Sequence, residues 1–300
     1  MMQTTPPTLL VISFAVYTVG IMAAGLLASR FRKNTSDDFY LASRELGPWA
    51  SALSASASSE SGWVMLGLVG AAFTGGVSTL WLIPGCAAGY LFNWYFVADR
   101  VRRASKKTGA QTLSELLAAR FGERAGVIHG LSLVIIGCAM IAYVAAQMSA
   151  SGKAFEAIFS LPYWSGVLLG AAVILTYTVT GGFRASVWTD VVQSTFMVIS
   201  LIAIPVLMLV KIGGMSGLAS GLAGASPDLL SFSAGNAGFG ALGFLLGWLS
   251  FGWGYPGQPH VLARFMGTRD SKAIRRGGVV AIVWSSVVFV GAILLGPVSY

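Results

Sequence analysis

Residues 49–73 read WASALSASASSESGWVMLGLVGAAF, a run that is long enough to cross a membrane. Six serines, Glu60 and Gly62 interrupt its first half. Because the hydrocarbon core has no water to satisfy polar groups, such a half-helix is costly when it faces lipid. The pattern indicates a helix that unwinds at mid-membrane and turns its polar atoms toward a cavity holding an ion or a solute. A small-residue seam between closely packed helices is the other interpretation, but Glu60 and the adjoining Trp63 favour the cavity.

The composition of the chain is that of an integral membrane protein. Of its 300 residues, 55% are hydrophobic and 10% are charged, whereas soluble domains carry about 25% charged residues. The mean hydropathy is +0.75. Cys86 and Cys138 lie in apolar runs without metal-ligand spacing, which indicates small buried side chains. No nucleophile–base set stands out, so the residues give no positive case for an enzyme.

Hydropathy predicts eight membrane-spanning helices, at residues 9–28, 47–73, 77–98, 125–148, 161–180, 187–211, 238–258 and 278–297. With the N-terminus outside, 17 of the 19 basic residues fall in the loops 29–46, 99–124, 181–186 and 259–277. This excess is the positive-inside signal of a multi-pass protein of the inner (plasma) membrane. The net charge of +8 therefore reports topology, and no nucleic-acid partner is expected. Basic residues follow the first apolar run instead of preceding it, which indicates a retained helix.

A second span is interrupted in the same manner, because residues 251–260 read FGWGYPGQPH. Pro256 and Pro259 each remove a backbone donor and clash with the preceding turn, so a regular helix cannot continue there. Paired interrupted segments in two halves of a chain are the best sequence pointer to a transporter's central site. The interrupted spans are the second and the seventh, which fits a repeat of five helices. The chain is therefore predicted to have four parts. They are a first helix with its loop (1–46), a first five-helix repeat (47–211), an external loop (212–237) and the start of a second repeat (238–300).

Broken helices suggest the chemistry of the site. Their freed carbonyls and nearby serine hydroxyls can coordinate a hard cation such as sodium, and their freed N–H groups favour an anionic group. Aromatic residues beside the breaks, and Tyr143 in the fourth span, are candidates for packing on a solute, with ordinary helix packing as the alternative. Asp190 lies just inside the sixth span. At membrane depth its carboxylate would need a partner or a function, whereas close to the interface it could cap the helix, and both interpretations are open.

Several strings then carry a family resemblance. They are Phe39-Tyr40-Leu41, Arg44-x-Leu46-Gly47-Pro48, Ala52-Leu53-Ser54-Ala55 through Ser61-Gly62-Trp63, Gly181-Gly182-Phe183 with Trp188-Thr189-Asp190, and Gly254-Tyr255-x-Gly257-Gln258-Pro259-His260 with Arg264-Phe265. In this order they resemble the sodium:solute symporter family, most closely its bacterial sodium/proline symporters. The resemblance implies an all-α integral membrane protein with the five-plus-five inverted-repeat transporter fold, here with about eight helices and an incomplete second repeat.

The resemblance also implies roles for single residues. Ala57 and Glu60 would offer main-chain carbonyls to sodium. The other ion-coupling positions would be Ser58, Ser59, Ser61, Gly62 and Asp190. The residues lining the substrate pocket would be Trp63, Tyr143, Phe251, Tyr255 and Pro259. Arg44 would lie at the internal mouth as a gating residue. Two positions depart from the proline symporters, which carry aspartate at the position of Ser59 and tryptophan at the position of Phe251.

The function implied is secondary active symport by alternating access. Sodium would be the coupling ion, with no other cofactor, and the solute would be proline or a related amino acid. A proton-coupled carrier of the same fold and a transporter-like sensor attached to a signalling domain remain as alternatives. The last span ends at Tyr300 without a polar tail, which predicts that the chain is a fragment. The resemblance implies that the remaining sodium hydroxyls come from a later helix, beyond Tyr300.

Overall fold

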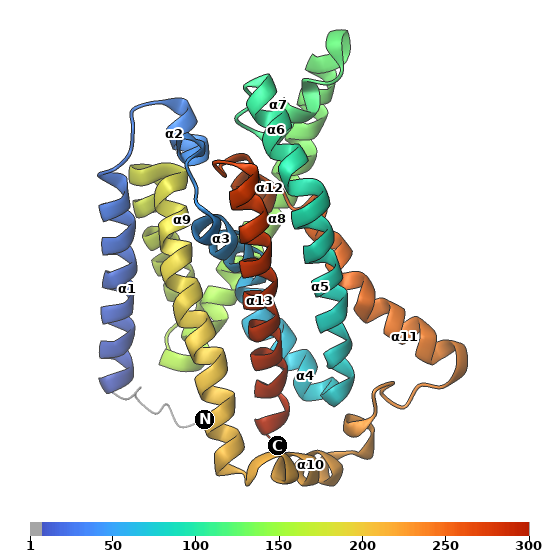
Figure 1. The fold of residues 1–300 in the computed structure, drawn as a ribbon. Helices are drawn as coiled ribbons and strands as arrows, with labels where there is room; N and C mark the ends of the chain where they lie inside the picture. Colours follow the sequence, from blue (N-terminus) through green and yellow to red (C-terminus); the bar gives the residue numbers. More distant parts are fainter. Residues whose placement is uncertain (1–7, 300) are drawn as a thin grey trace.

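The computed structural model describes residues 8–299, and within them the chain is almost entirely helical. The only extended pairing in this range is an isolated parallel bridge between Leu46 and Thr268. This confirms the predicted all-α class. Figure 1 shows most of the long helices running between two ends of the molecule, with α10 lying across the lower end.

The helices have the following bounds. They are α1 Thr8–Ser29, α2 Ser36–Leu41, α3 Pro48–Gly62, α4 Val69–Gly75, α5 Leu82–Phe92, α6 Asp99–Thr108, α7 Leu113–Ala118, α8 Ala125–Phe159, α9 Tyr163–Lys211, α10 Gly214–Ala225, α11 Gly238–Ser250, α12 Pro259–Met266 and α13 Ser271–Leu295. Short 3-10 or π-helical turns connect several of them, including the π-helical turns Trp63–Leu68 and Asn93–Ala98.

Five helical stretches in the described residues are long and apolar enough to cross a membrane. They are Thr8–Ser29, Pro48–Thr108, Gly122–Phe159, Tyr163–Lys211 and Ser271–Ser299. Two of them, with 61 and 49 residues, each contain two of the predicted spans. The predicted seventh span is absent from the set because it is divided into short pieces, so the count of eight spans stays a prediction.

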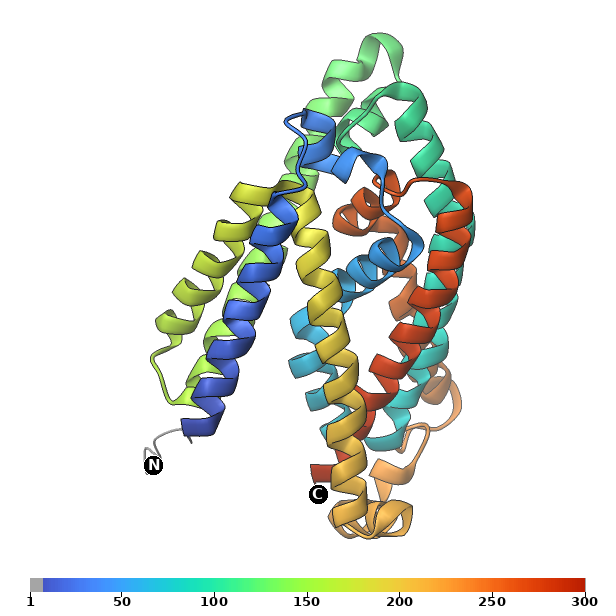
Figure 2. The ribbon, with the colours of Figure 1, turned by 60° about the vertical axis from the view of Figure 1, so that its left-hand side comes forward.

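Glycines with positive φ divide the two longest stretches. At Gly76, φ is +57° and the chain turns from α4 into the rising α5. At Gly182, φ is again +57°, which puts a kink inside α9. Only glycine adopts this backbone readily, because a Cβ atom there clashes with the chain. Figure 2 shows the two arms of α9, before and after Gly182, running in opposite directions. The predicted connection at 181–186 is therefore a tight reversal at Gly182, with helix on both sides of it.

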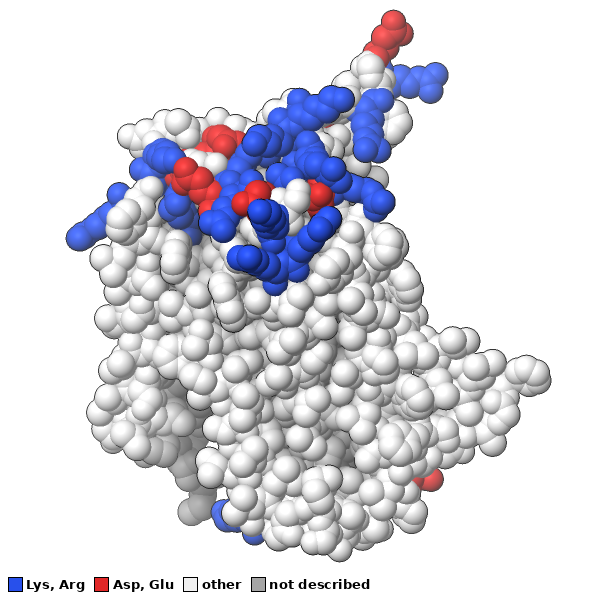
Figure 3. Space-filling model, viewed as in Figure 1, with Lys and Arg blue, Asp and Glu red and all other residues white. Residues whose placement is uncertain are grey.

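The other loops also contain more helix than expected. The expected external loop 212–237 contains α10, and the expected loop 259–277 contains all of α12 and the start of α13. Lys and Arg side chains nevertheless gather at one end of the molecule, over α2, α6 and α7, as Figure 3 shows. Most of the basic residues in this view therefore lie at one end, as their spacing predicts.

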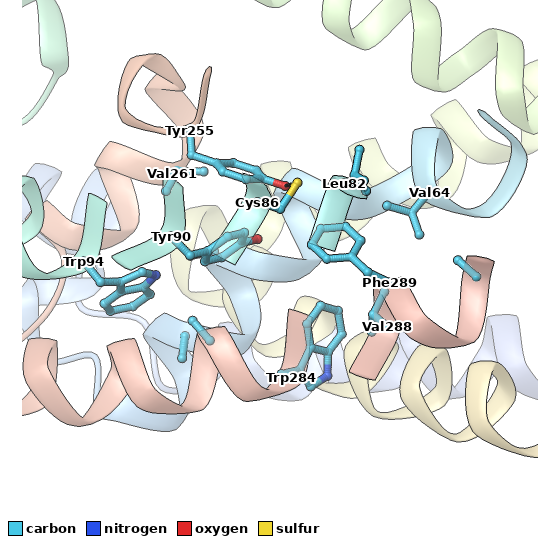
Figure 4. Packing of buried hydrophobic residues seen from close by; sticks show 14 of the residues in the cluster. Val64, Leu82, Cys86, Tyr90, Trp94, Tyr255, Val261, Trp284, Val288 and Phe289 are labelled. Carbon is cyan, nitrogen blue, oxygen red and sulfur yellow. Dashed lines mark hydrogen bonds between the residues drawn. The ribbon is translucent and has the colours of Figure 1, made fainter. Parts of the chain in front are cut away.

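The main core lies between α3, α5 and α13. Trp94, Phe265 and Phe289 are among its largest fully buried side chains. Figure 4 shows Tyr90 and Tyr255 facing one another in this core, with Cys86 beside the Tyr255 hydroxyl. On the other side α1 packs along α9 (Figure 2), while apolar side chains of α1 and α8 stay exposed, as expected of helices that meet lipid.

Candidate functional site

The first predicted break is present at the end of α3. Ser61 has φ −29° and ψ −127°, outside the helical region, and the π-helical turn follows at Trp63. Serine side chains hydrogen-bond to nearby backbone and weaken a helix from within. A π-helical turn is typical of functional sites in helices. The serine-rich run therefore ends in an opening of the helix, as the sequence predicts.

Side chains from α8 bind the backbone groups at this break. The Tyr143 hydroxyl donates to the Ser58 carbonyl at 2.6 Å, and the Gly62 N–H donates to Gln147 Oε1 at 3.2 Å. Tyr143 and Gln147 are four residues apart and so share one face of α8. Since buried backbone groups need partners, these two contacts hold the broken segment in a defined geometry.

The second predicted break separates α11 from α12. A 3-10 segment runs over Phe251–Gly257, Gln258 is extended with ψ 111°, and Pro259 opens α12 in its first turn. Proline suits that position because its missing N–H would have no helical partner there. The Asn93 side chain donates to the Tyr255 carbonyl at 3.3 Å, which satisfies one of the freed acceptors. The prediction of a second interrupted helix is confirmed.

The two breaks lie next to each other. The rings of Trp63, just after the first break, and Phe251, at the start of the second, stack with centroids 5.6 Å apart. His260 in α12 stacks on Tyr143 with centroids 4.9 Å apart. Helices α3 and α12 also contact one another directly. Two interrupted helices from distant parts of the chain therefore meet in one region.

A cavity of about 650 Å³ lies beside the first break, between α3, α8 and α9. Ala57, Ser58 and Ser61 face it from α3, and Tyr143 and Asp190 face it from α8 and α9. Positions 57, 58 and 61 lie on one side of a helix. No group of three or more His, Cys, Asp or Glu side chains gathers anywhere in residues 8–299, so ligands for a cation here would be carbonyls, hydroxyls and Asp190.

Asp190 forms an ion pair that the sequence analysis missed. Arg264 Nη2 lies 3.0 Å from Asp190 Oδ2, and Ser54 Oγ donates to the same oxygen at 2.6 Å. Arg264 Nε in turn donates to Ser54 Oγ at 3.0 Å. Asp190 lies within α9, past the Gly182 kink, so its interpretation as a helix cap is wrong.

The hydropathy pattern places Arg264 in the loop 259–277, and the structure corrects this. It is part of α12 and is 7% exposed. A signal was available, because an intramembrane carboxylate requires a partner and Arg264 falls one helical turn beyond His260. If the sequence after Pro259 is read as a helix, Arg264 lies on the same side as His260 and becomes a candidate partner for that carboxylate.

Ser59 and Glu60 do not face the cavity. Ser59 Oγ donates to the Ala55 carbonyl at 2.6 Å, and the fully buried Glu60 accepts from the Tyr90 hydroxyl at 2.7 Å. Successive helix residues are rotated by about 100°, so the Glu60 side chain points away from the side of α3 that carries Ala57, Ser58 and Ser61. The expectation that the whole polar run faces a single cavity is wrong for these two side chains.

Of the residues predicted to line a substrate pocket, Tyr143 lies at the cavity and the others lie elsewhere around the two breaks. Tyr143 borders the cavity, and Trp63 stacks on Phe251. Tyr255 is 5% exposed and packs on Tyr90 with ring centroids 4.4 Å apart, while Pro259 begins α12.

Arg44 lies at the basic end, in a network that joins distant segments. It donates to Ser105 Oγ at 2.6 Å and to the Ala110 carbonyl at 2.9 Å, and it pairs with Asp37 at 3.1 Å. Close by, Arg184 at the kink of α9 pairs with Asp38 at 2.6 Å. These contacts tie the connection between α1 and α3 to α6 and α9.

This network makes acid stability depend on Asp38. Burial alone would raise its pKa, but hydrogen bonds from Arg184, Ser43 and the Lys33 backbone hold the pKa of Asp38 below its ordinary value. Because the folded pKa is lowered, the pair adds stability above the unfolded pKa of about 3.9, and this stability is lost as the pH falls through the folded pKa. We expect the unfolding temperature of detergent-purified protein to fall less steeply below pH 4 in Asp38→Asn than in wild type. Equal slopes would contradict this.

Tyr143→Phe tests the contact that holds the first break. The change removes a 2.6 Å hydrogen bond and leaves the Ser58 carbonyl without that donor. An unmade hydrogen bond at a buried carbonyl costs about 1–3 kcal/mol. We therefore expect sodium and solute binding to weaken by roughly tenfold or more, measured by radioligand binding. Tyr163→Phe is the control that should leave binding unchanged, because this half-buried ring pairs with Trp164 at the start of α9 and does not line the cavity.

The fold and site define a membrane protein built around paired interrupted helices. Residues 39–299 match the sequence profile of the sodium:solute symporter family. The chain belongs to this family.

Two curated relatives and one solved structure illustrate the similarity. The sodium/proline symporter of Salmonella typhimurium is 36% identical over 290 residues, covering 96% of this chain and 57% of the relative. The high-affinity proline transporter PutP of Bacillus subtilis is 35% identical over 273 residues, covering 89% of this chain and 57% of the relative. A Na⁺-coupled sialic acid symporter, solved in a substrate-bound outward-open state, matches the fold with a TM-score of 0.73 at 20% identity, over 95% of this chain and 59% of its own. The chain thus spans a little over half the length of each.

Proposed function

We propose that the full-length protein couples inward movement of sodium to uptake of a small solute, proline or a related amino acid. The observation that carries this proposal is the meeting of two broken helices at Trp63 and Phe251, beside a polar cavity. Such a site presents backbone carbonyls to a cation and backbone N–H groups to an anionic solute. We also propose that residues 47–211 form the first five-helix repeat of the transporter fold.

For sodium, we propose the main-chain carbonyls of Ala57 and Glu60, with Ser58, Ser61 and Gly62 supporting the open segment. The Glu60 carbonyl accepts from the Trp63 N–H and keeps a second lone pair for an ion. Asp190, on the wall of the cavity, would attract the ion on its route inward. The side chain of Ser59 is committed to Ala55 and takes no part.

For the solute, we propose the region of the stacked Trp63 and Phe251 rings and of Tyr143. Flat aromatic faces suit the apolar ring of proline, and freed N–H groups at the start of α12 suit its carboxylate. Tyr255 would shape this region from behind, since it is buried against Tyr90. The names of the curated relatives, sodium/proline symporter and proline transporter, support this class of substrate.

The gathering of Lys and Arg at one end supports a defined orientation in the inner membrane. By the positive-inside rule this end faces the cytoplasm. The N-terminus would then lie outside, and the Arg44 network would lie at the internal mouth and gate it.

The test is uptake of labelled proline by proteoliposomes that contain the full-length protein. A tenfold sodium gradient with 100 mV of potential supplies about 3.7 kcal/mol per ion, so we expect accumulation up to a few hundredfold. Uptake should vanish when sodium is replaced by choline at fixed pH. Uptake that needs no sodium and follows a pH gradient would favour the proton-coupled carrier instead.

A further inference from the structure

Helix α3 has a second polar face that the cavity does not use. Ser54, Ser58 and Ser61 face Asp190 and Tyr143, whereas Ser56 and Glu60 point about half a turn away. Ser56 and Glu60 are four residues apart, so their side chains lie one above the other. Both are 0% exposed, and they face α5 and α13.

Two hydroxyl groups face the Glu60 carboxyl, and a third lies beside one of them. The Tyr90 hydroxyl donates to Oε1 at 2.7 Å. Ser285 of α13 faces the carboxyl, and its Oγ donates to Ser56 Oγ at 3.4 Å. The second carboxyl oxygen, Oε2, is buried and has no hydrogen-bond partner among the described residues. A buried carboxylate oxygen without a partner is costly, and it points to a missing ligand.

The charge of this carboxylate is also unbalanced. The titratable groups that interact with Glu60 are Tyr90 and Cys86 from α5 and Tyr255 from the second break, and none of them is cationic. Tyr90 itself belongs to the apolar core that contains Phe289 and Trp284 (Figure 4). Arg264 is bound to Asp190 and Ser54 on the opposite face of α3.

We propose that Glu60, Ser56, Ser285 and Tyr90 form a second binding site, for a monovalent hard cation of the size of sodium. Carboxylate and hydroxyl oxygens are the ligands that such cations take. A cation bound at about 2.4 Å places neighbouring ligands roughly 3.4 Å apart when they meet at a right angle, which is the separation of the two serine oxygens. The bound ion would join α3, just before its break, to α5 and α13.

The experiment measures sodium binding without solute. Full-length protein in detergent is titrated with NaCl against choline chloride at constant ionic strength, with ²²Na⁺ stoichiometry and unfolding temperature as readouts. We expect Glu60→Gln to bind one sodium ion fewer per protein and to lose part of the sodium-dependent rise in unfolding temperature. Ser285→Ala, which keeps the charge, should weaken binding of that ion by about tenfold or more.

Ser286→Ala is the matched control, because Ser286 Oγ donates to the Ile282 carbonyl within α13 and lies one residue away. It should bind sodium as wild type does. Unchanged stoichiometry in Glu60→Gln together with unchanged affinity in Ser285→Ala would overturn the proposal and leave Glu60 as a neutral buried acid. If Glu60→Gln does not fold, the comparison of sodium affinity between Ser285→Ala and Ser286→Ala still tests the proposed site. Failure of proline uptake would refute the proposed transport and leave this binding result standing.

Discussion

Arg264→Ala is expected to abolish sodium-dependent uptake and to destabilise the protein strongly. The change leaves Asp190 without its counter-charge and Ser54 without the donor Arg264 Nε. The two charged side chains are only 9% and 15% exposed, so solvent compensates little for the lost partner. Removing one member of a buried ion pair costs about 3–5 kcal/mol. The measurements are the unfolding temperature of the full-length protein in detergent and its uptake rate in proteoliposomes.

A double-mutant comparison separates the pair from its surroundings. Asp190→Asn in the Arg264→Ala background removes the stranded carboxylate, so the double variant should be more stable than Arg264→Ala alone. Arg264→Lys keeps the charge but not the planar fork that reaches both Ser54 and Asp190, so we expect partial recovery. If Arg264→Ala is as stable as wild type, the ion pair does not hold α12 against α9.

Gly252→Ala is expected to prevent the second broken helix from packing on α5. A Cβ atom at Gly252 would lie 2.0 Å from the Gly85 carbonyl oxygen, and one at Gly89 would lie 1.9 Å from the Gly252 carbonyl oxygen. These obstacles are backbone atoms and cannot rotate away. Overpacking of this kind costs typically 1–3 kcal/mol and occasionally more, and backbone displacement here would move Phe251 and Tyr255. We expect little folded protein in the membrane and no measurable uptake.

Gly254→Ala is the control within the same segment, since a Cβ atom there has no atom within 4 Å. It should reach wild-type levels in the membrane and retain uptake. The comparison is made by size-exclusion profile and unfolding temperature after purification. Equal behaviour of the two variants would show that α5 and the second break do not need backbone contact.

The positions of both breaks could be read from the sequence because their causes are local. Proline at positions 256 and 259 removes N–H donors wherever the segment packs, and a serine run that ends in Gly62 weakens its own helix. The gathering of basic residues at one end is likewise a property of the chain order. The reversal at Gly182 is also local, because a short polar interval with two glycines between apolar runs marks a connection between two helices.

The directions of the polar side chains came only with the tertiary structure. The sequence determined that Ser54, Ser56, Ser58 and Glu60 share a membrane helix, but which of them meets the cavity depends on where α8, α9 and α13 pack around it. Arg264 and Asp190 are 74 residues apart, and nothing local records that a kinked α9 and a short α12 bring them to 3.0 Å. Backbone chemistry acts within a few residues and is visible in the sequence, whereas pairing of charges depends on long-range packing, which the sequence does not show.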